Sequence, residues 1–388
     1  MRHGLAGLIL VGLVASGLWL HEHEDFGRRV AFLLIAGALF GWFLQRSRFC
    51  FFCILRDLFE NGDGRPALGI LAALAAGTVG YLVVFGAWVP DPGAGYLPPN
   101  AHIGPASWVL VAGGLSFGIG MSLSGSCISA HLYRLGEGSL TSIFALAGTV
   151  AGFLLGYQVW NRLWVTTIAT ADPVWLPARF GYSGSLALQF AALGLMALVL
   201  LRRVAPKAAE AGRPVNLGEI WQAVMVRRWP TWLGGTGIGI LGAFAYLRTG
   251  PLGVTAEINR LSRNLGDRWG LAPDRLEGLD RLAGCIVTEA AAWIGENGIF
   301  VLALIAASLA AALAAGQFRP ERKSLSAVLL ALAGGVLLGF GAMISLGCSI
   351  GTLLSGISAL AVSGWIFGAA MVAGVWASLP LRRRLLSE

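Results

Sequence analysis

The chain has 388 residues, of which 56% are hydrophobic and 12% charged, and its mean hydropathy is +0.72. A soluble domain carries roughly 25% charged residues, so this composition excludes an ordinary soluble protein. The net charge of +8 indicates basic loops that orient a membrane protein, and we predict no nucleic-acid partner. Because the sequence holds no Gly-Lys-Ser or Gly-Lys-Thr, it carries no phosphate-binding loop of an ATPase.

The apolar residues fall in blocks long enough to cross a bilayer as helices, and they lack the alternation of a membrane β-barrel. We therefore predict an all-α polytopic membrane protein. The first block resembles a signal peptide, but no small-residue cleavage site follows it, so residues 1–28 are interpreted as an extra N-terminal helix that is retained. The ten predicted spans are, in chain order, residues 4–20, 29–45, 67–89, 105–122, 141–160, 184–201, 230–247, 298–315, 325–343 and 362–379.

Positive charge gathers in four places along the chain. The positive-inside rule assigns all four to the cytoplasm, and the predicted spans place an even number of crossings between each consecutive pair, as that assignment requires. Both termini are then cytoplasmic, in the inner (plasma) membrane of a prokaryote, and the acidic residues 21–25 lie outside. The four basic stretches are residues 46–65, 202–228, 319–323 and 382–384.

Two glycine-rich stretches 221 positions apart share one template, and each ends on a cysteine. They are residues 113–127 and 334–348. Matched, glycine-interrupted apolar segments are typical of transporters whose two halves share one binding site. The identical pairs at this offset are Gly113/Gly334, Gly114/Gly335, Gly118/Gly339, Gly120/Gly341, Ser124/Ser345, Cys127/Cys348 and Leu132/Leu353.

The predicted orientations make the two copies an inverted-topology repeat. Span 105–122 runs into the cytoplasm, whereas its partner 325–343 runs out of it. We predict a first repeat at residues 29–201 and a second at residues 230–388, joined by a cytoplasmic linker at residues 202–229.

Each motif cysteine is followed by a segment too short to span, at residues 128–135 and 349–357. We predict re-entrant or broken helices that meet near the midplane, since non-helical backbone at that depth is tolerated where it lines a cavity. The alternative is that the glycines of these stretches serve close helix packing alone.

The segment 249–297 is the least membrane-like part of the second repeat, and we predict external amphipathic helices there. The eighth span could begin near Thr288, which would bring Glu289 and Glu296 into an apolar stretch. Acids inside a membrane are functional by default, so Glu289 is a candidate for coupling to a proton or cation. In the alternative, both acids belong to an outer cap.

An odd number of cysteines with irregular spacing argues against a disulfide scaffold. A lone buried cysteine often behaves as a small hydrophobic residue, but Cys127 and Cys348 each close the same motif, and we predict that they line a pathway. A neutral thiol donates weakly to a polarisable anion and releases it again, which suits transport. The five cysteines are Cys50, Cys53, Cys127, Cys285 and Cys348.

Cys50 and Cys53 form a Cys-Phe-Phe-Cys sequence, a spacing that also occurs in metal and redox sites. Zinc would need two further ligands, and no other cysteine or histidine lies nearby in the sequence. On a helix the two thiols would share one face and could line the same pathway. We predict no metal site and no cofactor.

Arg48 precedes Cys50 at the cytoplasmic mouth, where it anchors the orientation and can also draw in anions. Gly250, followed by proline, breaks the helix after the seventh span and frees backbone groups to face a ligand. His131 follows Cys127 closely, although a packed histidine is the simpler interpretation. The predicted pathway residues are Cys50, Cys127, Cys348, Gly125, Ser126, Gly347, Ser124, Ser345, Arg48 and Gly250, with Cys53, Glu289 and His131 as secondary candidates and no catalytic residue.

The Arg48-Phe49-Cys50 turn, the two Gly-x-Gly…Cys motifs and residues 250–255 resemble the YeeE/YedE family of thiosulfate permeases. The resemblance covers residues 30–385 and leaves the first helix outside the common core. It implies an all-α inverted repeat, central cysteines that pass thiosulfate by S–H···S hydrogen bonds, and in some members selenium or other sulfur substrates or a small cytoplasmic sulfur-carrier partner. The central cysteines carried over by motif are Cys50, Cys127 and Cys348, and the resemblance supplies no role for Cys53 or Cys285.

We therefore predict a permease, not an enzyme, that moves thiosulfate or a closely related sulfur anion and contacts membrane lipids. One alternative is a permease for a selenium compound. Another is a membrane thiol-redox or sulfur-transfer protein that uses Cys50 and Cys53. A third is a membrane protein with a scaffolding role alone.

Overall fold

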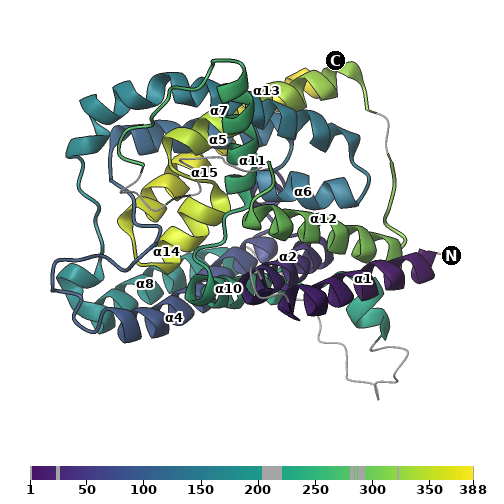
Figure 1. Cartoon of the computed structure of the whole chain (residues 1–388), viewed down its shortest axis with the longest axis horizontal. Helices are drawn as coiled ribbons and strands as arrows, with labels where there is room; N and C mark the ends of the chain where they lie inside the picture. Colours follow the sequence, from purple (N-terminus) through teal and green to yellow (C-terminus); the bar gives the residue numbers. More distant parts are fainter. Residues whose placement is uncertain are drawn as a thin grey trace.

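The computed structural model of the chain is a bundle of long helices, with both chain ends toward the right of the view in Figure 1. Within the described residues there is no β-strand, only two isolated bridges between loops, and this confirms the all-α prediction. The described residues are 2–22, 27–202, 221–279, 284, 286, 293–320 and 323–387. The helices are α1 (Arg2–Glu22), α2 (Gly27–Ser47), α3 (Phe51–Asn61), α4 (Arg65–Trp88), α5 (Trp108–Ser124), α6 (Ile128–Gly136), α7 (Leu140–Thr166), η1 (Ile168–Thr170), α8 (Pro177–Leu201), η2 (Gln222–Val226), α10 (Thr231–Arg248), α11 (Val254–Arg268), α12 (Glu296–Ala314), α13 (Leu325–Ile344), η3 (Ser349–Ser355), α14 (Gly356–Ser358) and α15 (Val362–Ser387).

Nine helices of the described chain are long and apolar enough to cross a membrane, so the protein is a multi-pass membrane protein. They correspond to nine of the ten predicted spans. The remaining one, predicted at residues 230–247, forms α10, an 18-residue helix with five glycines that is not among these nine. The eighth span begins at Glu296 as α12, whereas Cys285, Thr288 and Glu289 lie outside the described residues.

The long helices pack in two matched sets. α2 packs along α12 as α10 packs along α4, and α7 packs along α13 as α15 packs along α5. Glycines bring the first pair of interfaces close: a Cβ on Gly37 or Gly41 would overlap a carbonyl oxygen of α12, and one on Gly235 or Gly239 would overlap a carbonyl oxygen of α4. Backbone therefore meets backbone at these interfaces, which small residues permit between membrane helices.

α5 and α13 cross each other, and their contacts are reciprocal. A Cβ on Gly120 would lie 2.7 Å from the carbonyl oxygen of Gly334, and one on Gly341 would lie 2.7 Å from that of Gly113. The start of each helix thus faces the end of the other, so the two run antiparallel. Because these four glycines are repeat partners, each contact is the image of the other. The arrangement agrees with an inverted repeat, which stays a prediction together with its boundaries.

Short helices follow four of the long ones: α3 follows α2, α6 follows α5, α11 follows α10 and η3 follows α13. The predicted short segments after Cys127 and Cys348 are therefore α6 and η3, neither of which is long enough to span. A residue with positive φ precedes each of them: Gly125 at +84° and, 221 positions on, Leu346 at +62°. That these short helices meet near the midplane stays a prediction.

The segment predicted to be external and amphipathic has a buried start. α11 packs on α7 and α12, and its residues Thr255 and Asn259 are fully buried. Trp269, directly after α11, is exposed. Further along, the indole N–H of Trp160 in α7 donates a hydrogen bond to the carbonyl oxygen of Glu277 at 2.9 Å. This segment therefore enters the bundle at its first turn and then lies on the outside of α7.

Candidate functional site

Three of the predicted cysteines occupy one structural position, the residue before the first turn of a short helix. Cys50 precedes α3, Cys127 precedes α6, and Cys348 precedes η3, which continues into α14. All three residues are at most 1% exposed. The first turn of a helix leaves backbone N–H groups unpaired and carries partial positive charge, so each thiol lies at a place that favours an anion.

The N-termini of α3 and α6 meet, and the side chains of Cys50 and Cys127 interact. The backbone N–H groups of Phe51 and Ala130, in the first turns of the two helices, lie near the Cys127 sulfur. It lies 3.3 Å from the hydroxyl oxygen of Ser129. We name this group the Cys50–Cys127 site. It offers two thiols, a hydroxyl and two helix ends to one small ligand.

The second half holds a related arrangement around Cys348. Its sulfur accepts a hydrogen bond from the backbone N–H of Ile350 at 3.4 Å. The side chain of Thr255, in the first turn of α11, lies near the thiol, and its hydroxyl has no hydrogen-bond partner within the described residues. We name this group the Cys348 site. In the Cys50–Cys127 site the second group is the Cys50 thiol at the start of α3, whereas in the Cys348 site it is the Thr255 hydroxyl at the start of α11. The sequence analysis did not predict the contribution of Thr255.

The predicted residues Ser124 and Ser345 hold the turns that lead into the two motif cysteines. The Ser124 hydroxyl lies 2.8 Å from the carbonyl oxygen four residues before it and 3.1 Å from the one two residues after it. The Ser345 hydroxyl lies 2.6 Å from the carbonyl oxygen of Gly341, four residues before it, and 3.1 Å from that of Gly347, two residues after it. Both hydroxyls therefore bond to the backbone, where they stabilise the turn that leads into the cysteine.

Gly125, Ser126 and Gly347 belong to the same turns. Gly125 adopts a left-handed conformation and accepts a hydrogen bond from the Ser126 hydroxyl at 2.6 Å. Gly347 has no room for a side chain, because a Cβ would lie 2.7 Å from the Thr352 hydroxyl and 3.0 Å from Nε2 of His102. These residues shape the backbone before each cysteine. His102, which the sequence analysis did not place near the motif, packs on the second turn.

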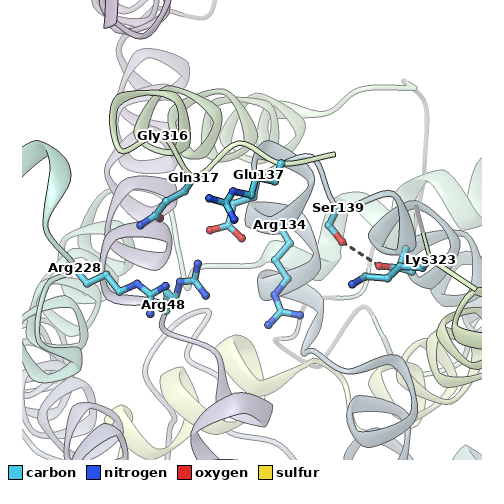
Figure 2. A pocket seen from close by; sticks show the side chains of 10 residues that line it. Arg48, Arg134, Glu137, Ser139, Arg228, Gly316, Gln317 and Lys323 are labelled. Atoms are coloured by element: carbon cyan, nitrogen blue, oxygen red, sulfur yellow. Dashed lines mark hydrogen bonds between the residues drawn. The ribbon is translucent and has the colours of Figure 1, made fainter. Parts of the chain in front are cut away.

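A cavity of about 460 Å³ is lined by Arg48, two residues before Cys50, and among its described lining residues five are cations and one, Glu137, is an acid. Figure 2 shows Arg48 and Arg228 side by side, with the guanidinium of Arg134 pointing away from Glu137. Partial burial, and then the like charge of Arg48, lower the pKa of Arg228. This excess of positive charge attracts anions. We name it the basic cavity; its other cations are Arg319 and Lys323.

A second cavity, of about 480 Å³, lies at the opposite end of α2. Gly250, with φ at +124°, lines it together with the loop that leads into α11, so this cavity borders the Cys348 site. Its charges are paired: Arg29 lies 2.8 Å from Glu296, and Arg260 lies 3.4 Å from Glu257. The two cavities therefore have similar volumes and different electrostatics.

The secondary candidates fall in different places. Cys53, on α3, accepts a hydrogen bond from the guanidinium of Arg134 at 3.1 Å. His131 is buried in α6, where its Nδ1 lies 3.2 Å from the hydroxyl of Ser142, as in a packed histidine. Glu289 lies outside the described residues. The described part of the chain holds no cluster of metal-ligating side chains, and its four cysteines are free.

Comparison with known proteins gives one family and several relatives. The sulphur transport family matches residues 46–377 of the chain. The chain is 28% identical over 354 residues to the thiosulfate transporter TsuA of Escherichia coli (strain K12), covering 88% of this chain and 92% of that protein. It is 25% identical over 358 residues to the thiosulfate transporter TsuA of Spirochaeta thermophila, covering 88% and 96%. It is 27% identical over 200 residues to the probable transporter YedE of Salmonella typhimurium, covering 52% and 46%.

The matched region holds the residues from which the site is built. It begins in the last turn of α2, takes in both glycine-rich cysteine motifs and all four short helices, and ends in α15. The relatives are named as transporters, which agrees with the prediction that the chain is not an enzyme. The helical membrane fold and the match over most of the chain lead to one assignment. The chain belongs to the sulphur transport family.

Proposed function

We propose that the chain is a permease for thiosulfate or a closely related sulfur anion. In this proposal the anion moves between the two cavities by way of the Cys348 site and the Cys50–Cys127 site. Two relatives aligned over more than nine-tenths of their length are named thiosulfate transporters. The observation that carries the proposal is that three buried cysteines each stand at the N-terminus of a short helix.

The chemistry of thiosulfate suits these sites. It is a dianion with a soft terminal sulfur. Backbone N–H groups at the start of a helix can bind its oxygens without a full opposing charge, and a thiol can donate to its terminal sulfur in an S–H···S hydrogen bond. Because a thiol is a weak donor, each such contact is weak, and the anion can leave one site for the next.

We further propose that the basic cavity faces the cytoplasm, across the inner membrane of a prokaryote, with both termini on that side. The positive-inside rule supports this orientation, because Arg134 of the basic cavity and Arg382 near the end of α15 both approach Gly125. A small cytoplasmic sulfur-carrier protein is a compatible acceptor for an anion released there. Lipids would cover the exposed apolar faces of α1 and α8.

Uptake of radiolabelled thiosulfate into proteoliposomes tests the proposal. We expect Cys127→Ala and Cys348→Ala each to reduce the initial rate to near background, since each removes a thiol from the path. The matched control is Ser122→Ala, which removes one buried side-chain atom from α5 and should leave uptake intact. Normal uptake in both cysteine variants, with protein yield and monodispersity unchanged, would exclude the cysteine path. Running the assay with and without a proton gradient identifies coupling.

A contact between the side chains of Cys50 and Cys53 also suits the alternative of thiol-redox or sulfur-transfer chemistry. In that chemistry a thiolate would take the terminal sulfur of thiosulfate, which leaves a persulfide on one of these cysteines and releases sulfite, and it would fail in Cys53→Ser. Mass spectrometry of the protein after exposure to thiosulfate separates the two functions. Free thiols together with continuing uptake support permeation, whereas a stoichiometric persulfide supports sulfur transfer. Competition by sulfate and by selenite tests whether the substrate is a selenium compound.

A further inference from the structure

Cys53 has no role in the path proposed above, yet an arginine holds its thiol. Nη2 of Arg134 lies 3.1 Å from the Cys53 sulfur, and Nη1 of the same guanidinium donates to the carbonyl oxygen of Gly125 at 3.3 Å. Gly125 belongs to the turn that ends in Cys127. Arg134 also lines the basic cavity, so one guanidinium connects the cavity with the surroundings of the buried thiols.

Arg382, near the end of α15, reaches the same turn. Its guanidinium carbon lies 5.1 Å from the centre of the Phe52 ring, and its Nη2 would lie 3.2 Å from a Cβ on Gly125. Its Nε is buried and has no hydrogen-bond partner within the described residues. Arg134 and Arg382 therefore converge on one glycine, from helices that are far apart in the sequence.

The charge of this arginine pair is not balanced by the described part of the protein. No carboxylate there forms an ion pair with Arg134 or Arg382. Glu60, an acid whose charge acts on Arg382, is already paired with Arg383 at 2.8 Å. Two like charges near one turn repel each other, and an anion between them offsets that repulsion.

The surroundings of the turn before Cys348 lack these charges at the equivalent positions. Both cysteine motifs share the glycine-rich sequence, the turn and its serine, so the arginines are an addition around the turn before Cys127 alone. The turn before Cys348 packs without such arginines, so packing alone does not require Arg134 and Arg382 at the turn before Cys127. At the offset of 221 positions, Ser355 is the counterpart of Arg134, and Asn161 is the counterpart of Arg382. Cys53 lies three residues after the residue that precedes α3, and the residue in the same place relative to α11 is Ala256.

We propose that Cys53, Arg134 and Arg382 form a further anion site, the arginine site, between the Cys50–Cys127 site and the basic cavity. It takes a divalent sulfur oxyanion: the two guanidiniums bind its oxygens, and the Cys53 thiol contacts its terminal sulfur. The identity of the anion rests on the proposed function. Binding of an oxyanion at the arginine site depends only on the charges of Arg134 and Arg382 and not on the proposed function.

The exposure of the arginine site accounts for its release of the anion. Cys53 and Arg134 are partly exposed, whereas Cys50 and Cys127 are fully buried. Water and salt in the adjoining cavity weaken an ion pair, so an anion held at the arginine site exchanges with solution. In a dry site, two arginines would retain a dianion. The arginine site therefore draws the anion off the last thiols and passes it to the basic cavity.

Labelling of Cys53 tests the arginine site without a transport measurement. Two methanethiosulfonate reagents of opposite charge, one bearing a sulfonate and the other a trimethylammonium group, attack the same thiolate. The ratio of their rates therefore reports the local potential and not the reactivity of the thiol. Mass spectrometry assigns the labelled cysteine in the full-length, detergent-purified protein. We expect the anionic reagent to react at Cys53 on the order of tenfold faster, and we expect thiosulfate to protect Cys53.

Paired substitutions identify the source of the potential. Arg134→Gln combined with Arg382→Gln should abolish both the preference for the anionic reagent and the protection. Arg134→Lys combined with Arg382→Lys keeps the charge and should keep the preference. The matched control is Arg202→Gln combined with Arg227→Gln, which removes the same net charge from two exposed positions outside the site and should change neither result.

Several outcomes decide the matter. Equal rates of the two reagents in the unaltered protein, or an unchanged preference in the glutamine pair at positions 134 and 382, would overturn the arginine site. Sulfate lacks the terminal sulfur, so protection as strong as that by thiosulfate would overturn the contact with Cys53. Protection without uptake into proteoliposomes would support the arginine site and refute the proposed function. Uptake that depends on Cys127, without protection of Cys53 by thiosulfate, would support the proposed function and refute the arginine site.

Discussion

The hydroxyl of Ser116 donates a hydrogen bond to the carbonyl oxygen of Leu337 at 3.0 Å. Leu337 stands 221 positions after Ser116, the offset that relates the two glycine-rich motifs, so a residue meets its own counterpart. Such a contact lies on the axis that would relate the two halves. In an inverted repeat, α5 and α13 would cross at that axis, and the chain would leave the crossing in opposite directions toward Cys127 and Cys348.

The crossing of α5 and α13 leaves no room for a side chain at Gly120. A Cβ there would lie 2.7 Å from two backbone atoms of α13, the oxygen of Gly334 and the nitrogen of Leu338. We expect Gly120→Ala to lower the free energy of unfolding by about 1–3 kcal/mol, measured by thermal unfolding in detergent. Gly194→Ala in α8, where no atom lies within 4 Å of the added carbon, should be neutral or slightly stabilising. Equal losses in both variants would contradict the close approach.

Arg48 allows stability and charge to be separated, because it is a non-glycine residue with φ at +49°. Arg48→Gly and Arg48→Ala remove the same charge from the basic cavity, but glycine adopts this conformation without strain. We expect the glycine variant to be more stable than the alanine variant by about 1 kcal/mol, as measured by thermal unfolding. Their uptake rates should be lowered equally. A difference in uptake that follows the difference in stability would show that the charge is irrelevant.

Thr255 is predicted to act on the anion through its hydroxyl. Thr255→Val keeps the shape of the side chain and removes the group that faces Cys348. We expect initial uptake to fall about tenfold, the cost of one lost hydrogen bond, while thermal stability stays unchanged, since the hydroxyl has no oxygen or nitrogen partner within the described residues. Thr149→Val is the control, because that buried hydroxyl bonds the carbonyl oxygen of Ala145 within α7 at 2.9 Å. Equal uptake in the two variants would remove Thr255 from the path.

The two cavities should respond differently to salt. The basic cavity carries an excess of cations, whereas the second cavity pairs Arg29 with Glu296. Raising the ionic strength screens the attraction of an anion to the first far more than to the second. We expect KM for thiosulfate to rise more steeply with salt at the face of the basic cavity, measured in proteoliposomes of each orientation. The same salt dependence at both faces would contradict an electrostatic role for this cavity.

Block length and hydropathy are sufficient to predict most of the long helices, since a helix in lipid must be continuously apolar over its full length. The seventh predicted span forms the helix α10, which carries five glycines, and its packing on α4 shows why those glycines are present. The repeated motif predicts the short helices after Cys127 and Cys348. Identical residues at one fixed offset are enough to predict both short helices, because the same turn occurs before each of them.

The arginine site and Thr255 could not be predicted in this way. Arg382 reads as one of several basic residues at a helix end, and only the fold brings it to Gly125. Thr255 is hidden because α11 begins 203 positions after α3, whereas the cysteine motifs are 221 apart. An insertion between these elements changes the offset, so pairing of the predicted spans 29–45 and 230–247 indicates the counterpart of the Cys50 region, whereas the offset of 221 does not.

Glycine-to-backbone contacts join α2 to α12, α4 to α10 and α5 to α13. Backbone meets backbone at these contacts, so one helix cannot slide past its neighbour without a clash of main-chain atoms. We therefore expect the frame to stay rigid during a transport cycle. The motions left are turns of cysteine side chains and tilts of the short helices, which occur faster than rocking of whole domains. A protein built in this way would work as a fixed conduit with movable contacts.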